Sequence, residues 1–250
     1  MARYQVVLVY DGTEFQGFQR QAKDSSISRT VQAVVEAVLQ QLGWQDRSIL
    51  VAGRTDTGVH ASGQVIAFNL DWKHSVDELR AALNALLPMD VAARSVNPVK
   101  ADFHPRYGAL ARRYRYRIYC QAVRDPLRDR FAWRVWPAVE TNRMEQAARH
   151  LIGTHDFASF GTPPRSGGST IRSVSQAGWY MEGADLVFEI VGNAFLYHMV
   201  RRLVFVLVAI GQRRLEPETI SGCLEGSSQS IVQGLAPSQG LTLVEVIYPT

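Results

Sequence analysis

The residues best suited to chemistry lie in one polar stretch of the chain, residues 53–61 (GRTDTGVHA). Two apolar runs flank it, residues 49–52 and 65–68, and each has the composition of a strand. A hairpin alone would need a shorter connection, and loops held by a rigid sheet often carry functional side chains. We therefore take Asp56, the carboxylate of this loop, as the first candidate for catalysis.

A loop carboxylate such as Asp56 can act as a nucleophile, a general base or a metal ligand, or it can simply form a turn. Arg54 favours catalysis, because a neighbouring guanidinium would keep the carboxylate ionised and hold it in one orientation. His60 could assist Asp56 or bond the loop backbone instead, and Asp11 is a possible second carboxylate. The histidines are scattered without the spacing of a metal site, so we expect no metal (His60, His104, His155 and His198).

The tripeptide Asp-Thr-Gly at residues 56–58 also occurs in aspartic proteases, which need two such aspartates sharing a proton. This sequence has one copy, so a protease would have to be a symmetric dimer. Such proteases are nearly all β-structure, whereas residues 30–42, 75–87 and 194–211 have helical periodicity. The sequence therefore argues against a protease.

A second unusual stretch is residues 111–119 (ARRYRYRIY), in which arginine and tyrosine alternate. In a strand, Arg113 would share one face with two further arginines, while Tyr114 would share the other face with Arg112 and a second tyrosine. Proteins hold extruded or single-stranded bases by stacking them on aromatic rings beside a phosphate-binding surface. Residues 112–134 contain eight arginines against two aspartates, which favours nucleic-acid binding; the alternative is an exposed strand with a basic face.

The charge of the whole chain also points to nucleic acid. The 250 residues carry a formal net charge of +4, with a sequence pI near 9.2. Of the 27 Lys and Arg residues only three are lysines, which leaves 24 arginines. Arginine forms two-pronged bonds to phosphate and stacks on bases. The alternative is an arginine content raised by genome composition or heat adaptation.

The composition is that of a globular protein, with 46% hydrophobic and 20% charged residues. The longest apolar run, residues 203–210, is too short to cross a bilayer, which takes about 20 apolar residues. Cys120 and Cys223 fit no metal or redox motif, and no signal peptide is recognised. We therefore expect a cytoplasmic protein that does not bind a membrane.

Hydrophobic periodicity divides the chain into two runs of elements in nearly the same order. The first run is β-α-β-β-α-β, at residues 4–10, 31–42, 49–52, 65–68, 75–87 and 91–99. Thr30 and Ser75 are expected to cap its helices, Ser75 in a capping box with Glu78. The second run is β-α-β-β-α-α-β, at residues 112–119, 141–152, 171–180, 186–191, 194–211, 217–224 and 241–248.

This doubled order is that of the ferredoxin-like, or split βαβ, fold. We therefore expect an α+β protein of two ferredoxin-like (βαββαβ) domains, residues 1–107 and 108–250. Their sheets are expected to join into one continuous, mainly antiparallel sheet with helices on one face, and a basic active-site cleft is expected between the halves. Residues 16–30 are polar and basic and predict a long loop.

Together these stretches resemble the TruA family of tRNA pseudouridine synthases. The resemblance covers nearly the whole chain and rests on separated motifs in the right order: residues 53–61, 10–12, 17–21, 63–65, 102–106, 111–116, 156–160, 193–195, 198–201 and 240–243. Two departures are visible, because the family usually has Trp at the position of Phe18 and often Ala at that of Thr57. Neither departure removes a functional group.

The resemblance implies two ferredoxin-like domains, a homodimer and no cofactor. It implies isomerisation of uridine to pseudouridine at positions 38, 39 and 40 of the tRNA anticodon stem-loop. Asp56 would be the nucleophile, Arg54 its partner and Tyr114 the residue that stacks on the target base. Arg201 and Leu241 would line the active site.

The arginines and the loop of residues 20–30 are expected to hold the RNA backbone, with Arg20, Arg112 and Arg113 as candidates. The isomerisation neither gains nor loses atoms, so it requires no cofactor or metal. The alternative function is a non-catalytic RNA-binding protein that uses the same basic surface.

Overall fold

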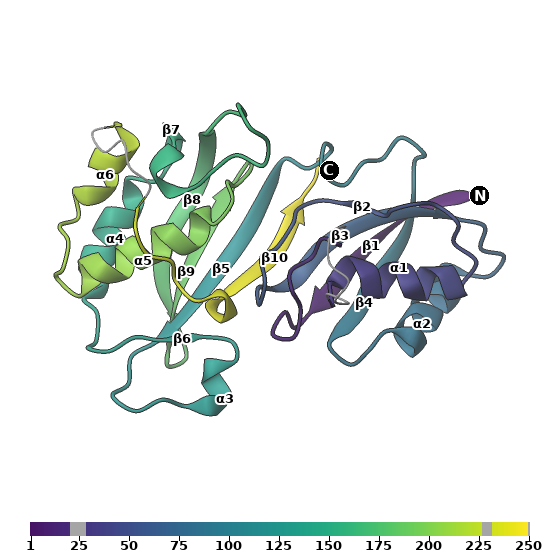
Figure 1. The fold of residues 1–250 in the computed structure, drawn as a ribbon, viewed down its shortest axis with the longest axis horizontal. Helices are drawn as coiled ribbons and strands as arrows, with labels where there is room; N and C mark the ends of the chain where they lie inside the picture. The colour runs from purple at the N-terminus through teal and green to yellow at the C-terminus, as the bar shows by residue number, and fades with distance from the viewer. Residues whose placement is uncertain (21–28, 227–231, 250) are drawn as a thin grey trace. The chain divides into compact units, whose positions relative to one another are not determined.

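The computed structural model describes residues 1–20, 29–226 and 232–249 (Figure 1). The chain forms two compact units. Unit 1 comprises Met1–Leu110 and Leu243–Thr250, and unit 2 comprises Ala111–Thr242. The division after Leu110 lies close to the predicted boundary at residues 107 and 108. The last strand, which the sequence predicts within the second domain, has most of its residues in unit 1.

Unit 1 is built in the predicted β-α-β-β-α-β order. Its central strand β1 (Ala2–Tyr10) pairs antiparallel with β3 (His60–Leu70) on one side and with β4 (Val91–Val99) on the other. The strand order is β4-β1-β3-β10, with the short β2 also paired to β3. The remaining elements are α1 (Val31–Gln41), β2 (Leu50–Val51), α2 (Val76–Leu86) and β10 (Leu241–Ile247).

The helices of unit 1 begin where the sequence predicted. The side chain of Thr30 accepts a hydrogen bond from the N–H of Ala33 at the start of α1. At the start of α2, Ser75 and Glu78 form the reciprocal capping box, which satisfies two N–H groups that the helix leaves open. Alternate residues of β1 are buried, and α1 and α2 lie side by side over the strands (Figure 1).

Unit 2 is also a layer of antiparallel strands with helices packed against it. The strand order is β5-β9-β8-β7, and β6 pairs parallel with β5. Helix α4 packs on both α5 and β8. The elements are β5 (Ala111–Tyr119), α3 (Pro126–Asp129), β6 (Trp133–Arg134), α4 (Thr141–Arg149), β7 (Gly153–Asp156), β8 (Ile171–Glu182), β9 (Asp185–Gly192), α5 (Met199–Gly211) and α6 (Thr219–Leu224), with single 3-10 turns at Ala158–Phe160 and Ser238–Gly240.

One predicted helix begins later than expected. Periodicity placed its start at residue 194, but α5 begins at Met199. His198, just before it, has a left-handed backbone with φ of +65°, which no α-helix can contain. Residue 197 instead forms an isolated bridge to residue 162. The apolar side chains before Met199 therefore belong to a loop.

The α+β class with a mainly antiparallel sheet is confirmed. Short elements such as α3, β6 and β7 were not predicted, because two to four residues carry too little periodicity. Part of the predicted loop at residues 16–30, namely residues 21–28, lies outside the described residues. Within the described ranges, no helix is both long and apolar enough to cross a membrane.

Candidate active site

The loop that carries Asp56 connects β2 to β3 and turns sharply after the aspartate. The N–H of Val59 donates to the carbonyl of Asp56 at 3.1 Å, and Gly58 has a left-handed φ of +75°. Most side chains would be strained at that φ, so the turn favours glycine. The turn is therefore closed by main-chain atoms of Asp56 and by the backbone freedom of Gly58.

A second loop, residues 11–18, bonds to the backbone of the first. The N–H of Phe18 donates to the carbonyl of Thr55 at 3.0 Å. The N–H of Gly58 donates to the carbonyl of Phe15 at 3.2 Å. These two bonds lie on either side of Asp56 in the sequence, so the main chain is held before and after the carboxylate.

Two glycines allow the loops to come this close. A Cβ atom at Gly12 would lie 2.1 Å from the carbonyl oxygen of Val59, a distance at which the backbone would have to move. Gly17 has a φ of +87°, and a Cβ there would lie 3.0 Å from the carbonyl oxygen of Thr55. The contact between the loops therefore depends on residues without side chains.

Phe18 supports the loops from the core. Its side chain is completely buried, and its ring lies 6.3 Å from the ring of Tyr10, centroid to centroid. A completely buried ring has no free face for a base. The position at which the family usually has Trp is therefore a packing position in this protein.

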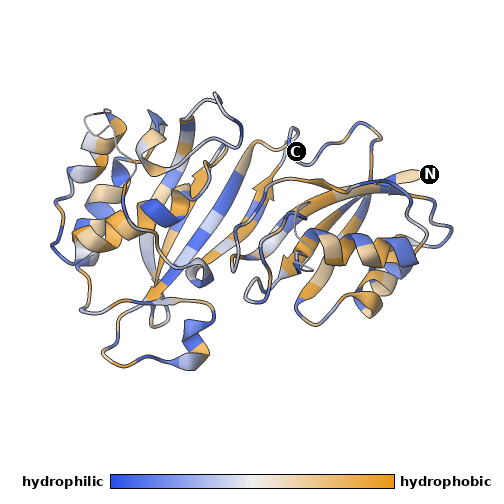
Figure 2. Ribbon diagram, in the orientation of Figure 1, coloured by the Kyte–Doolittle hydropathy of each residue, from blue (hydrophilic) through white to orange (hydrophobic). Residues whose placement is uncertain are grey.

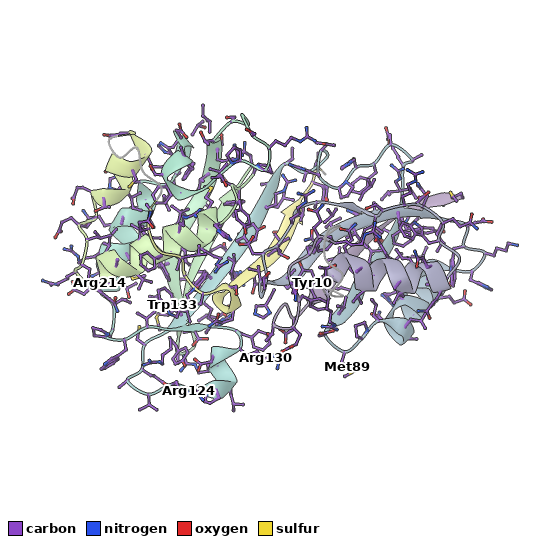
Figure 3. All side chains as sticks on the ribbon, in the orientation of Figure 1. Tyr10, Met89, Arg124, Arg130, Trp133 and Arg214 are labelled. Carbon is purple, nitrogen blue, oxygen red and sulfur yellow. The ribbon has the colours of Figure 1, made fainter. Side chains whose placement is uncertain are left out.

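A buried network of polar side chains joins the Asp56 loop to β1 and β3. The hydroxyl groups of Tyr10 and Thr55 are hydrogen-bonded at 2.8 Å, and Tyr10 is labelled in Figure 3. The Nε2 of Gln64 donates to the carbonyl of Gly53 at 2.8 Å and to the Tyr10 hydroxyl at 3.4 Å. Burial raises the pKa of Tyr10 to about 12, so the phenol keeps its proton at neutral pH. All three side chains lie within the motifs of the resemblance, but the sequence assigned none of them a role.

His60 and Asp11 brace the same region. His60 is buried, and its Nδ1 lies 3.0 Å from the N–H of Gly12 and 3.1 Å from Oδ1 of Asp11. The same carboxylate oxygen accepts hydrogen bonds from the N–H and the hydroxyl of Thr13. Of the two roles left open for His60, the structure therefore supports bonding to backbone, although the N–H that it binds belongs to Gly12 of the second loop.

Asp56 is half-buried, whereas Arg54 is exposed. The pairing of these two residues stays a prediction. Arg20 belongs to the same unit, and its guanidinium lies 3.2 Å from the carboxylate of Glu36, whose side chain is 3% exposed.

The arginine strand predicted from the sequence is β5, which stands out as a hydrophilic strand in Figure 2. Its alternation is as predicted, with Tyr114 and Tyr116 buried. Arg112 donates to the carbonyl of Asn193 at 2.8 Å. Tyr114 meets the ring of Phe195 edge-on.

The arginine face of β5 is not an open basic surface. Glu189 of β9 lies opposite Arg115 and accepts from it at 2.7 Å, and from Arg113 at 2.6 Å. Although burial acts to raise the pKa of Glu189, hydrogen bonds from these arginines hold it below its ordinary value. Arg117 pairs with Asp185 at 3.1 Å. The expected basic face is therefore a ladder of ion pairs, and an RNA contact by Arg113 stays a prediction.

Arg201 and Tyr116 anchor the short segment that leads into Leu241. The Nε of Arg201 donates to the carbonyl of Ala236 at 2.7 Å, and the Tyr116 hydroxyl donates to the carbonyl of Pro237 at 2.7 Å. Burial raises the pKa of Tyr116 well above its ordinary value, in spite of the positive charge of Arg201. Leu241 follows this segment and is buried.

The predicted residues thus fall into two sets. Unit 1 contains Arg20, Arg54 and Asp56, and unit 2 contains the others (Arg112, Arg113, Tyr114, Arg201 and Leu241). In the described parts of the chain, no group of three or more His, Cys, Asp or Glu side chains could hold a metal ion.

The sequence signal that could have revealed the hydrogen-bonded network of Tyr10, Thr55 and Gln64 was Gln64 itself, an amide beside the apolar run of residues 65–68.

Known proteins are similar to this chain over almost its whole length. A family model described as tRNA pseudouridine synthase matches residues 7–108 and 147–249. A tRNA pseudouridine synthase A from Moorella thermoacetica is 40% identical, over 97% of this chain and 98% of that protein. The protein of that name from Geobacillus kaustophilus is 39% identical, over 98% of this chain and 94% of that protein. The one from Halalkalibacterium halodurans is 37% identical, over 96% of this chain and 90% of that protein.

Proposed function

This chain belongs to the tRNA pseudouridine synthase family, and on that premise we propose that Asp56 is the nucleophile of a uridine isomerisation in tRNA. The reaction breaks the N1–C1′ bond of a uridine, turns the uracil and joins its C5 to C1′. An ionised carboxylate can attack C1′ or C6, or can remove the 2′ proton of the ribose. The number of atoms in the nucleotide is unchanged, so the proposal involves no cofactor.

The rigid setting of Asp56 is the observation that supports this role. Thr55 before it and Gly58 after it are hydrogen-bonded to the loop of residues 11–18. A reactive group held in one place before the substrate arrives loses little freedom in the transition state, and this lowers the barrier. A loop that served only to connect two strands would not need these bonds.

The target base must leave its stack in the RNA before C1′ becomes accessible, at a cost of a few kcal/mol. In our proposal the ring of Tyr114 stacks on the extruded base and replaces part of the lost stacking. Arg201 and Leu241 line the same site, and Arg54 pairs with Asp56. Arg20, Arg112 and Arg113 contact the phosphates, a role in which Arg113 would have to share its guanidinium with Glu189.

The proposed substrate is the anticodon stem-loop of tRNA, with uridines 38, 39 and 40 as targets. We also propose that the enzyme acts in the cytoplasm as a homodimer. Light scattering on the purified protein, alone and with tRNA, tests the dimer. A monomer under both conditions would contradict it.

The experiment that tests Asp56 uses tRNA labelled with tritium at C5 of uridine. Joining C5 to C1′ releases this hydrogen to water, so tritium release measures turnover. Asp56→Ala and Asp56→Asn should release no tritium above background while still binding tRNA. Near-normal turnover by either variant would remove Asp56 from the mechanism.

The proposed positions need their own test. Unmodified tRNAs that differ in whether they carry uridine at 38, 39 or 40 are incubated with the protein, and the pseudouridines in the products are mapped. Pseudouridine at these positions alone is the expected result. Pseudouridine only in another arm of the tRNA would contradict the proposed site while leaving the family assignment intact.

A further inference from the structure

We propose that Tyr10, Thr55 and Gln64 form a positioning device for Asp56: a buried hydrogen-bonded chain that fixes the backbone of the catalytic loop without touching the substrate. The inference rests on the proposed role of Asp56. It goes further in assigning part of the catalytic rate to three side chains that lie behind the loop.

Thr55 is the point at which the chain acts on Asp56. It is the residue directly before the aspartate and is itself buried. Its hydroxyl is bonded to Tyr10 at 2.8 Å and its carbonyl to the N–H of Phe18 at 3.0 Å. Because side chain and main chain are both held, the peptide that leads into Asp56 has little freedom to rotate.

Gln64 holds the loop at a second point. Its side chain is completely buried, and its Nε2 donates to the carbonyl of Gly53, three residues before Asp56, at 2.8 Å. The same Nε2 donates to the Tyr10 hydroxyl at 3.4 Å. Thr55 and Gly53 are thereby tied to the same pair of side chains, one on β1 and one on β3.

The network is a continuous chain of hydrogen bonds. The amide N–H of Gln64 donates to the Tyr10 oxygen, and the hydroxyls of Tyr10 and Thr55 share a hydrogen bond in which either can be the donor. Because burial raises the pKa of Tyr10 to about 12, the phenol stays neutral well above neutral pH. The chain links Gln64 through Tyr10 to Thr55.

The network also carries a cost that simple packing would avoid. The Oε1 of Gln64 is buried and has no hydrogen-bond partner among the described residues. An apolar side chain of similar size at this place in β3 would leave no polar atom unsatisfied. The hydrogen bonds that this amide donates to Gly53 and Tyr10 explain why an amide is present here.

Tyr10→Phe is the main test, because it removes one oxygen atom and keeps the ring. The matched control is Tyr4→Phe. Tyr4 is buried on the same face of β1, and among the described residues its hydroxyl forms no hydrogen bond. In single-turnover assays of tritium release, Tyr10→Phe should lower the rate roughly ten- to hundredfold, with tRNA affinity within threefold of the parent. Tyr4→Phe should stay within twofold of the parent rate.

Thr55 provides the second test, which does not depend on how well Tyr10→Phe folds. Thr55→Val keeps the shape of the side chain and loses the hydroxyl, whereas Thr55→Ser keeps the hydroxyl. Thr55→Val should lose rate as Tyr10→Phe does, and Thr55→Ser should recover most of it. All rates are measured well below the melting temperature of each variant, so a loss of folded protein cannot imitate a loss of positioning.

The outcomes separate this inference from the proposed function. Parent-like rates in both Tyr10→Phe and Thr55→Val, with Asp56→Ala inactive, would overturn the positioning device alone. Equal impairment in Thr55→Ser and Thr55→Val would overturn it too, because the hydroxyl would then not be the cause. If Asp56→Ala itself were active, the proposed function would fail first.

Discussion

The ring of Phe195 meets the ring of Tyr114 edge-on, with the ring centroids 5.1 Å apart and the ring planes at 81°. Edge-to-face contacts of this kind stabilise by about 0.5–1.5 kcal/mol and fix the direction of both rings. Phe195 precedes α5 in the loop that the left-handed His198 closes. The orientation of the ring we propose for base stacking is therefore set by a residue on another element.

Replacing Phe195 should weaken catalysis through Tyr114. Phe195→Leu keeps an apolar side chain but removes the aromatic ring that orients the tyrosine, and we expect kcat/KM for tritium release to fall roughly tenfold. Phe195→Tyr, which keeps the aromatic ring, serves as the control and should retain most of the activity. Equal activity in Phe195→Leu and the parent would show that Tyr114 does not need this neighbour.

The proposed stacking role of Tyr114 makes a prediction about its hydroxyl. Tyr114→Phe keeps the aromatic face and should retain turnover within a few-fold, because stacking does not use the phenol oxygen. Tyr114→Ala should lose activity by at least a hundredfold, corresponding to about 3 kcal/mol of lost stacking. An inactive Tyr114→Phe with normal tRNA binding would mean that the phenol takes part in the chemistry.

The ion pairs of Glu189 should make unit 2 sensitive to acid. The pKa of Glu189 is lower in the folded protein than its ordinary value, which is about 4.3 in an unfolded chain. Its stabilising contribution is therefore present above about pH 4.3 and is lost as the pH falls through the lower folded pKa.

Urea unfolding at a series of pH values tests this sign. At pH 7, Glu189→Gln should reduce the free energy of unfolding by about 1–2 kcal/mol, because two partly exposed arginines lose a charged partner that is itself buried. The difference from the parent should shrink as the pH is lowered below about 4.3. Glu225→Gln, at an exposed glutamate, is the control and should change little at any pH.

The close approach of the two loops predicts a severe effect at Gly12. A Cβ there would lie 2.1 Å from the carbonyl oxygen of Val59, so Gly12→Ala must push the loops apart. We expect a loss of roughly 1–3 kcal/mol in the free energy of unfolding, the usual cost of overpacking, together with reduced turnover.

Gly53→Ala is the matched control for stability, since a Cβ at Gly53 would meet no atom within 4 Å. Its free energy of unfolding should stay within about 0.5 kcal/mol of the parent value. Similar melting curves for Gly12→Ala and Gly53→Ala would contradict the tight contact between the loops.

The sequence by itself determined the order of the main strands and helices and the α+β class. These features depend on residues only a few positions apart. Thr30 and Ser75 satisfy N–H groups within the same turn, and the alternation along β1 follows from the two faces of a strand. The Asp56 loop could be recognised for the same reason, since its residue types and spacing are local.

The tertiary structure decided which partners the functional residues meet. Thr55 bonds to Tyr10, which is 45 residues away in the sequence, and Arg115 meets Glu189, which is 74 residues away. Neither pair follows from periodicity, because the pairing register of strands distant in sequence is set by the packing of the whole sheet. The arginine strand therefore looked like an open basic surface in the sequence, and the folded chain supplies the carboxylates that balance it.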